Sequence, residues 1–323
     1  MMKNLLIFLA ILSGFYLVGI FFRDKQWKDF KFMAVKHTNI CRAVAAIIII
    51  LQHVSGGFGL RYFTPLGGIG VAMFLILSGY GLNESYKKKR GGGYWQTKII
   101  RVFVPYLIIA IVTMGIQLFS GAEVAVPYYW YLDFMLFWYV VFYLLITIPK
   151  MYERRYLVLS VISVITFAFC SIIGNGLRAE QAVSFLIGVW LSDNYEKARK
   201  WLTNSAVLIT LLLVGTALLI MKQIPAIRTQ EEGVAWQGIQ LVMKTSFAMA
   251  LIGCTYLLRK AFNNGFIVFV SGISYELYLV HFKLLSFPPK GIWGMCLFCG
   301  LSLLGAWMIN QVTSGLKKKL CSD

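Results

Sequence analysis

Long apolar runs, separated by short basic clusters, are the feature that most limits how this chain can fold. A helix that crosses a bilayer needs about 20 mainly apolar residues, and eleven segments of the 323-residue chain come close to that length. They are residues 4–22, 40–57, 67–84, 99–119, 128–148, 156–174, 181–194, 204–222, 238–258, 264–285 and 291–315. The pattern predicts an all-α fold, a polytopic transmembrane helical bundle of about 11 spans, in which 181–194 is the shortest.

The composition agrees with a chain that lies in lipid. Apolar residues make up 59% of the chain and charged residues 14%, whereas soluble domains have roughly 45–50% and about 25%. A net charge of +18 would favour a nucleic-acid partner in a soluble chain. Here Lys and Arg gather between the apolar runs, which is typical of membrane topology. We therefore expect the lipid bilayer as a partner and no nucleic acid.

The placement of the charges predicts an orientation. If each of the eleven segments crosses once, twenty-two Lys and Arg lie on one side and seven on the other. The seven are Lys3, Arg61, Arg178, Lys222, Arg228, Lys283 and Lys290. Because the side rich in Lys and Arg is cytoplasmic, the sequence predicts an integral protein of the cell membrane with its N-terminus outside and its C-terminus inside.

The first apolar run resembles a signal peptide, but it lacks a cleavage site. Large and charged residues follow it, in the order Phe21-Phe22-Arg23-Asp24, where a signal peptidase needs small ones. We therefore expect a retained signal-anchor helix. The predicted organisation is this helix with a basic cytoplasmic linker (1–39), a membrane domain (40–316) and a short basic cytoplasmic tail (317–323).

Two ionisable residues lie in the second apolar run. Arg42 and His53 are eleven residues apart, so on a helix they share one face about 16 Å apart along the axis. An Arg near the cytoplasmic end can bind phosphate through its planar fork, and a neutral His can take or relay a proton. The alternative is that Arg42 extends to the interface and that His53 hydrogen-bonds a neighbouring helix.

Further polar residues mark three later segments. Ser78 and Gly79 lie in 67–84, where small residues would also serve close helix packing. Lys98 and Arg101 close a basic segment that suits phosphates, although topology alone would place cations there. The run 264–285 combines hydroxyls, a carboxylate and a second intramembrane histidine in Ser274, Tyr275, Glu276 and His281. For Glu276, a structural hydrogen bond is the alternative to a role in orienting a polar partner.

In their order and spacing these segments resemble the acyltransferase-3 family of integral membrane acyltransferases. The matching pieces are Arg42-x10-His53, Phe74 through Ser78-Gly79-Tyr80, Lys98-x-x-Arg101, Tyr129-Trp130-Tyr131-Leu132, and Ser274-Tyr275 through His281. The resemblance covers residues 40–315 and implies ten family helices with both ends cytoplasmic. It also implies that residues 40–316 form a membrane acyltransferase domain.

The resemblance implies an O-acyltransferase that moves an acyl group, expected to be acetyl, from cytoplasmic acyl-CoA to a hydroxyl of a cell-surface glycan, glycolipid or precursor. Acyl-CoA would be a co-substrate, with no bound cofactor. His53 would act as general base or acyl carrier, and Arg42, Lys98 and Arg101 would hold the phosphates. The supporting residues would be Ser78, Trp130, Ser274, Tyr275, Glu276 and His281.

Two departures from the family pattern bear on this prediction. Lys98 replaces the first Arg of the loop motif, which keeps the charge but loses bidentate geometry. The chain also ends soon after its last apolar run. We therefore expect the acceptor to meet the membrane domain directly or through a separate extracytoplasmic partner protein.

A transporter or flippase is the rival hypothesis, for a small anion or a glycan intermediate. Intramembrane Lys244 and Glu276, together with Arg42 and His53, would also suit a proton or anion pathway. The ordered set of family motifs favours the enzyme. We expect no metal site, because the sequence has no cluster of metal-ligating residues.

Overall fold

The computed structural model describes residues 30–57, 63–229, 233–285 and 291–320. Within these ranges the regular structure is helical and contains no β-strand, which confirms the all-α class. The predicted helix 4–22 and residues 321–323 lie outside the described residues.

The helices follow the predicted apolar runs closely. The long ones are α2 (Val35–Gly57), α3 (Pro65–Lys89), α5 (Val104–Phe119), α6 (Trp130–Thr147), α8 (Arg155–Ile172), α12 (Ser205–Met221), α14 (Val234–Leu257), α16 (Gly265–Leu284) and α17 (Gly291–Leu320). The shorter ones are α4 (Tyr94–Lys98), the π-helix η2 (Ile99–Phe103), α7 (Pro149–Glu153), α9 (Gly176–Ala179), α10 (Ser184–Asp193), α11 (Tyr195–Leu202), α13 (Pro225–Arg228) and α15 (Arg259–Phe262).

The number of spans is smaller in the described residues than the sequence predicts. Eight helices are long and apolar enough to cross a membrane, or nine if α11 and α12, which meet at 76°, are counted as one span. The predicted span 181–194 forms α10, whose ten residues reach only about 15 Å and cannot cross a bilayer alone. The polytopic bundle is therefore confirmed, whereas eleven spans stay a prediction.

The short helix α10 packs closely against α3 through glycines. A Cβ atom on Gly79 would collide with the backbone of Phe185, and one on Gly188 would collide with the backbone of Ile76. The absence of side chains at these two positions lets the helices approach at backbone distance. The packing role considered for Gly79 is confirmed, and the contact also fixes the position of the neighbouring residue Ser78.

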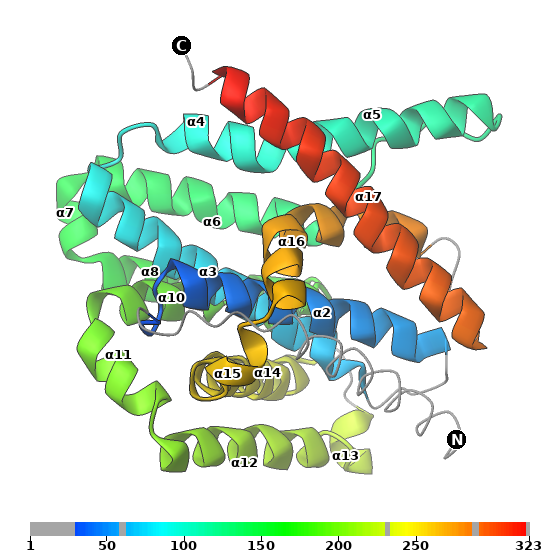
Figure 1. Cartoon of the computed structure of the whole chain (residues 1–323). Coiled ribbons are helices and arrows are strands. Elements are labelled where there is room, and N and C mark those ends of the chain that lie inside the picture. The colour runs from blue at the N-terminus through cyan, green and yellow to red at the C-terminus, as the bar shows by residue number, and fades with distance from the viewer. Residues whose placement is uncertain (1–29, 58–62, 230–232, 286–290, 321–323) are drawn as a thin grey trace.

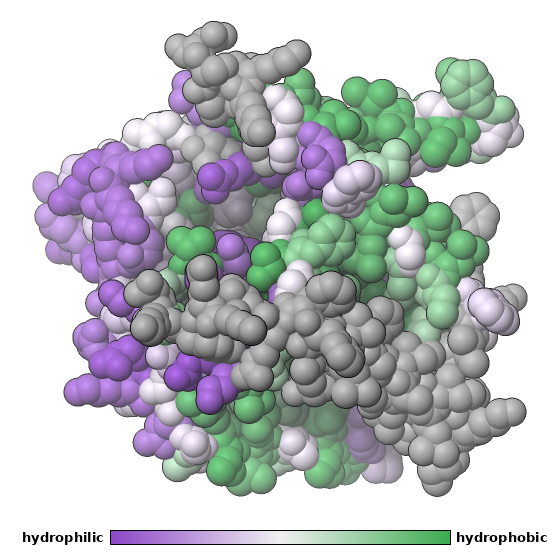
Figure 2. Space-filling view, viewed as in Figure 1, coloured by the Kyte–Doolittle hydropathy of each residue, from purple (hydrophilic) through white to green (hydrophobic). Residues whose placement is uncertain are grey.

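Polar contacts between helix termini mark the two ends of the bundle. At one end, Asp193 at the end of α10 pairs with Lys87 of α3 at 3.2 Å and with Arg155 of α8 at 2.7 Å. At the other end, Gln181 donates a hydrogen bond to the carbonyl oxygen of Gly68 at 2.9 Å. Hydrophilic residues gather on the left in Figure 2, where Figure 1 places α7 and α11.

Apolar residues cover the parts that project from the bundle. Helix α5 extends beyond its neighbours at the upper right of Figure 1, and hydrophobic residues cover it in Figure 2. Its exposed side chains include Ile111, Ile116 and Phe119. Such a surface suits contact with lipid tails.

The basic segment that leads to Lys98, residues 85–98, is mostly helical. Helix α3 continues to Lys89, and Arg90 then ends it with a left-handed backbone (φ 48°) whose N–H bonds the carbonyl of Tyr86. After a short turn, α4 leads into the π-helix that carries Arg101. The cations are therefore held on helices, and a π-turn of this kind often occurs at functional sites.

Candidate active site

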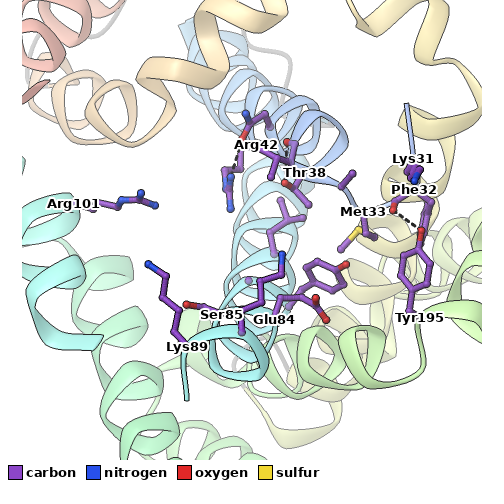
Figure 3. A pocket seen from close by; sticks show the side chains of 17 residues that line it. Lys31, Phe32, Met33, Thr38, Arg42, Glu84, Ser85, Lys89, Arg101 and Tyr195 are labelled. Carbon is purple, nitrogen blue, oxygen red and sulfur yellow. Dashed lines mark hydrogen bonds between the residues drawn. The ribbon is translucent and has the colours of Figure 1, made fainter. Parts of the chain in front are cut away.

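A wide cavity, which we call the basic vestibule, opens beside the N-terminal part of α2 and the C-terminal part of α3. Its volume is about 670 Å³. Figure 3 shows Arg42, Lys89 and Arg101 converging on this space from α2, α3 and η2. Its other cations are Lys31 and Lys88, and its only carboxylate among the described residues is Glu84. The vestibule is therefore strongly positive.

A second cavity of about 320 Å³, which we call the tyrosine cavity, adjoins the vestibule and shares Arg42 and Arg101 with it. The side chains that distinguish it are hydroxyls and one further cation: Ser78, Lys98, Tyr131, Tyr139, Ser274, Tyr275 and Tyr278. The structure thus brings six of the predicted site residues to one cavity. These are Arg42, Ser78, Lys98, Arg101, Ser274 and Tyr275.

The cations of the two cavities lack carboxylate partners. None of the ion pairs among the described residues includes Lys31, Arg42, Lys88, Lys89, Lys98 or Arg101. Glu84 is already occupied, since it pairs with Lys87 at 2.9 Å and accepts a hydrogen bond from Ser192 at 2.7 Å. A group of unpaired cations around a cavity favours a polyanionic ligand.

Neighbouring polar groups hold the wall of the tyrosine cavity in place. The Arg42 guanidinium donates to the Asn39 side-chain oxygen at 2.9 Å. The Lys98 ammonium lies 4.8 Å from the centre of the Tyr139 ring, at cation–π distance. The Tyr275 hydroxyl donates to the carbonyl oxygen of Val102 at 3.0 Å, which ties α16 to the π-helix.

Four predicted residues lie outside the tyrosine cavity. Trp130 packs edge-on against Tyr131, with 6.2 Å between ring centres. Glu276 is buried and accepts a hydrogen bond from Asn310 of α17 at 3.2 Å, which is the structural alternative considered for it. The other two, His53 and His281, lie together beyond the cavity wall.

The two histidines are neighbours from different helices. Their ring centres are 5.4 Å apart, with an interplanar angle of 43°. His281 also lies 5.6 Å from the ring of Tyr278, which lines the tyrosine cavity. Since Arg42 and His53 share the unbroken helix α2, the cations and the histidine pair occupy successive depths of the bundle.

Sequence reasoning missed Tyr131, Tyr139 and Tyr278 of the tyrosine cavity and three lysines of the vestibule. Tyr278 follows the predicted Tyr275 by three residues and hence lies on the same helix face, so a second tyrosine in this apolar run was a usable signal. The lysines Lys31, Lys88 and Lys89 carried no such signal, because exposed basic residues at a cytoplasmic boundary look alike.

A comparison with known protein families identifies the family of the chain that holds these cavities. The acyltransferase-3 family, described as an acyltransferase domain, matches residues 38–311. The chain belongs to the acyltransferase-3 family. It is a membrane acyltransferase, and the match includes every predicted site residue. No curated protein and no solved structure matches it.

Two intramembrane residues of this acyltransferase, Lys244 and Glu276, would also suit a transport pathway. The structure shows that each has a structural partner within the bundle. Lys244 forms an ion pair with Glu180, and both side chains are over nine-tenths buried. Glu276 is hydrogen-bonded as described above. Within the described part of the chain, no group of three His, Cys, Asp or Glu is placed to hold a metal ion.

Proposed function

We propose that this membrane acyltransferase uses acyl-CoA, with acetyl as the expected acyl group, and esterifies a hydroxyl of a cell-surface glycan, glycolipid or precursor. Acyl-CoA is proposed as the donor because cations without carboxylate partners surround the vestibule, and because the vestibule continues into a cavity lined by hydroxyl groups. The groups of acyl-CoA are arranged in a matching order, with phosphates at one end and a thioester on a flexible arm at the other.

The phosphates would lie among Arg42, Lys98 and Arg101, where charge-assisted hydrogen bonds are available. Lys88 and Lys89 extend this positive surface toward the outside of the vestibule. The arm would enter the tyrosine cavity, with its thioester directed toward Tyr278 and the histidine pair. A volume of about 320 Å³ is within the usual range for small-molecule sites.

The chemistry would be completed at His53. As a general base, it would take the proton of the acceptor hydroxyl while the oxygen attacks the thioester carbonyl. The C–S bond then breaks, and the CoA thiolate receives that proton. As a carrier, the His53 nitrogen would first attack the thioester carbonyl, the C–S bond would break, and the CoA thiolate would leave with the imidazole proton. The acceptor oxygen would then attack the acyl-imidazole, and the released imidazole would take the hydroxyl proton.

The orientation follows from the charges. We propose that the basic vestibule faces the cytoplasm and that the acceptor, or a separate extracytoplasmic partner protein, approaches from the opposite face of the cell membrane. The twenty-two to seven division of Lys and Arg supports this orientation. It would bring acyl-CoA to the side of the membrane where it is made.

The orientation predicts how introduced cysteines react. In a variant without native cysteines, a cysteine at Gly92, in the turn before α4, should resist an impermeant maleimide added to intact cells. A cysteine at Ala122, in the exposed segment after α5, should react. Both should react in permeabilised cells. The reverse pattern on intact cells would show that the orientation is wrong.

The proposed reaction is tested with purified protein, acetyl-CoA and cell-envelope glycan. We expect free CoA thiol to appear only when the glycan is present, together with a new ester on the glycan. A deletion strain should lose the same ester. Flux of an anion or a glycan intermediate across vesicles, without consumption of acetyl-CoA, would instead support the transporter.

Arg101 is expected to contribute to donor affinity. Removing a charge-assisted phosphate contact costs roughly 1.5–3 kcal/mol, so Arg101→Ala should raise the KM for acyl-CoA about tenfold or more. Arg101→Lys should be partly tolerated, because it keeps the charge. Arg154→Ala is the matched control, since Arg154 is exposed and lines neither cavity. An unchanged KM in Arg101→Ala would assign this residue to topology alone.

A further inference from the structure

His281 has one nitrogen whose role the structure fixes. Its Nδ1 lies 2.9 Å from the carbonyl oxygen of Leu277. A carbonyl oxygen only accepts hydrogen bonds, so Nδ1 must carry the hydrogen. In a neutral imidazole the other nitrogen, Nε2, is then an acceptor with a free lone pair.

That acceptor has no hydrogen-bond partner in the described part of the chain, although the His281 side chain is only 1% exposed. A buried polar atom without a partner costs free energy. His37, the other fully buried histidine, is the contrast. Its Nδ1 accepts from the Met33 N–H at 2.9 Å, and its Nε2 bonds the Thr255 hydroxyl at 3.1 Å. Both ring nitrogens of His37 are therefore satisfied, whereas one nitrogen of His281 is not.

The group beside the unpartnered nitrogen is His53. The two ring centres are 5.4 Å apart, a separation at which two imidazole rings can share a nitrogen-to-nitrogen hydrogen bond, and the His53 ring is only partly buried. The nearest carboxylate in sequence on α16, Glu276, is five residues earlier, about 140° around the helix. It is engaged with Asn310 at 3.2 Å, so no carboxylate of α16 serves His53.

We propose that His281 is a positioning residue for His53, whose ring N–H it accepts at Nε2. This inference rests on the proposed role of His53. The hydrogen of His53 would be held on the nitrogen that faces α16, and its other nitrogen would be unprotonated toward the acceptor. When His53 takes the hydroxyl proton, the imidazolium keeps this hydrogen bond. A carboxylate commonly orients a catalytic histidine. The neutral His281 nitrogen would hold the His53 N–H in the same way without burying a negative charge in the bundle.

The kinetic test uses two substitutions at His281, each made in the wild type and in His53→Gln. His281→Phe keeps a ring without an acceptor, and His281→Gln keeps a side-chain carbonyl that can accept. We expect His281→Phe to lower kcat roughly tenfold or more with the KM for acetyl-CoA unchanged, and His281→Gln to recover part of the loss. In the His53→Gln background neither should lower kcat further, because residues that act as a unit are not additive.

A chemical test needs no turnover. Diethylpyrocarbonate modifies unprotonated imidazole nitrogens, so its rate at His53, measured by peptide mass spectrometry, should fall several-fold in His281→Phe. His37 is the internal control and should stay unmodified in both proteins. An unchanged rate at His53 overturns the inference, as does an equal loss of kcat in both backgrounds. A reduced rate at His53 in a protein that never releases CoA would instead overturn the proposed function.

Discussion

Replacing His53 with alanine is expected to abolish acyl transfer while the protein still inserts and folds. His53 lies on α2 beyond the tyrosine cavity, next to a histidine with a free acceptor nitrogen. Losing a general base typically costs about 10²–10⁴ in rate, and losing a covalent carrier can cost more. Folding should survive, because no hydrogen bond of the described structure depends on the His53 ring.

The measurement is acyl transfer to the glycan, expressed per folded molecule after matched membrane expression. His37→Gln is the control on the same helix, since His37 is fully hydrogen-bonded and lines neither cavity. It should lower the folded fraction more than the rate of each folded molecule. Near-normal transfer by His53→Ala would assign the chemistry to another residue.

The cations that line the tyrosine cavity could be singled out from the sequence by their charge and their position along the apolar runs. Arg42, Lys98 and Arg101 are cations at or near apolar runs, and the structure places all three around the tyrosine cavity. Ser274 and Tyr275 joined them through the family resemblance. For Arg42, which lies inside an apolar run, a charged residue in a place that disfavours charge was a signal by itself.

What the sequence could not give was the relative rotation of helices. The contact between His53 and His281 joins residues 228 positions apart, and periodicity within each helix does not say that the two faces meet. The burial of α10 against α3 could not be read from the sequence for a similar reason. Segment 181–194 is apolar because it is buried against α3 through Gly79 and Gly188, and hydropathy does not separate burial in protein from burial in lipid.

The ion pair between Lys244 and Glu180 could not be predicted from the sequence either, because Lys244 comes from an apolar run and Glu180 from a connecting segment. Lys244 of α14 packs its side chain against Gly68 of α3, and Glu180 follows α9. Next to them, Gln181 is fully buried and bonds the Gly68 carbonyl. The pair therefore joins three parts of the bundle at the end opposite the vestibule.

Replacing Lys244 with methionine is accordingly expected to destabilise the protein by about 3–5 kcal/mol, because the Glu180 carboxylate would stay buried without a cation. Thermal unfolding of the purified protein in detergent measures the effect. The double variant Lys244→Met with Glu180→Gln should recover most of the loss, since it removes both charges. Arg199→Met, which breaks the exposed pair with Glu196, is the matched control and should cost under about 1 kcal/mol. If the double variant is as unstable as Lys244→Met alone, packing of the lysine chain against Gly68, rather than the uncompensated charge, holds this end of the bundle together.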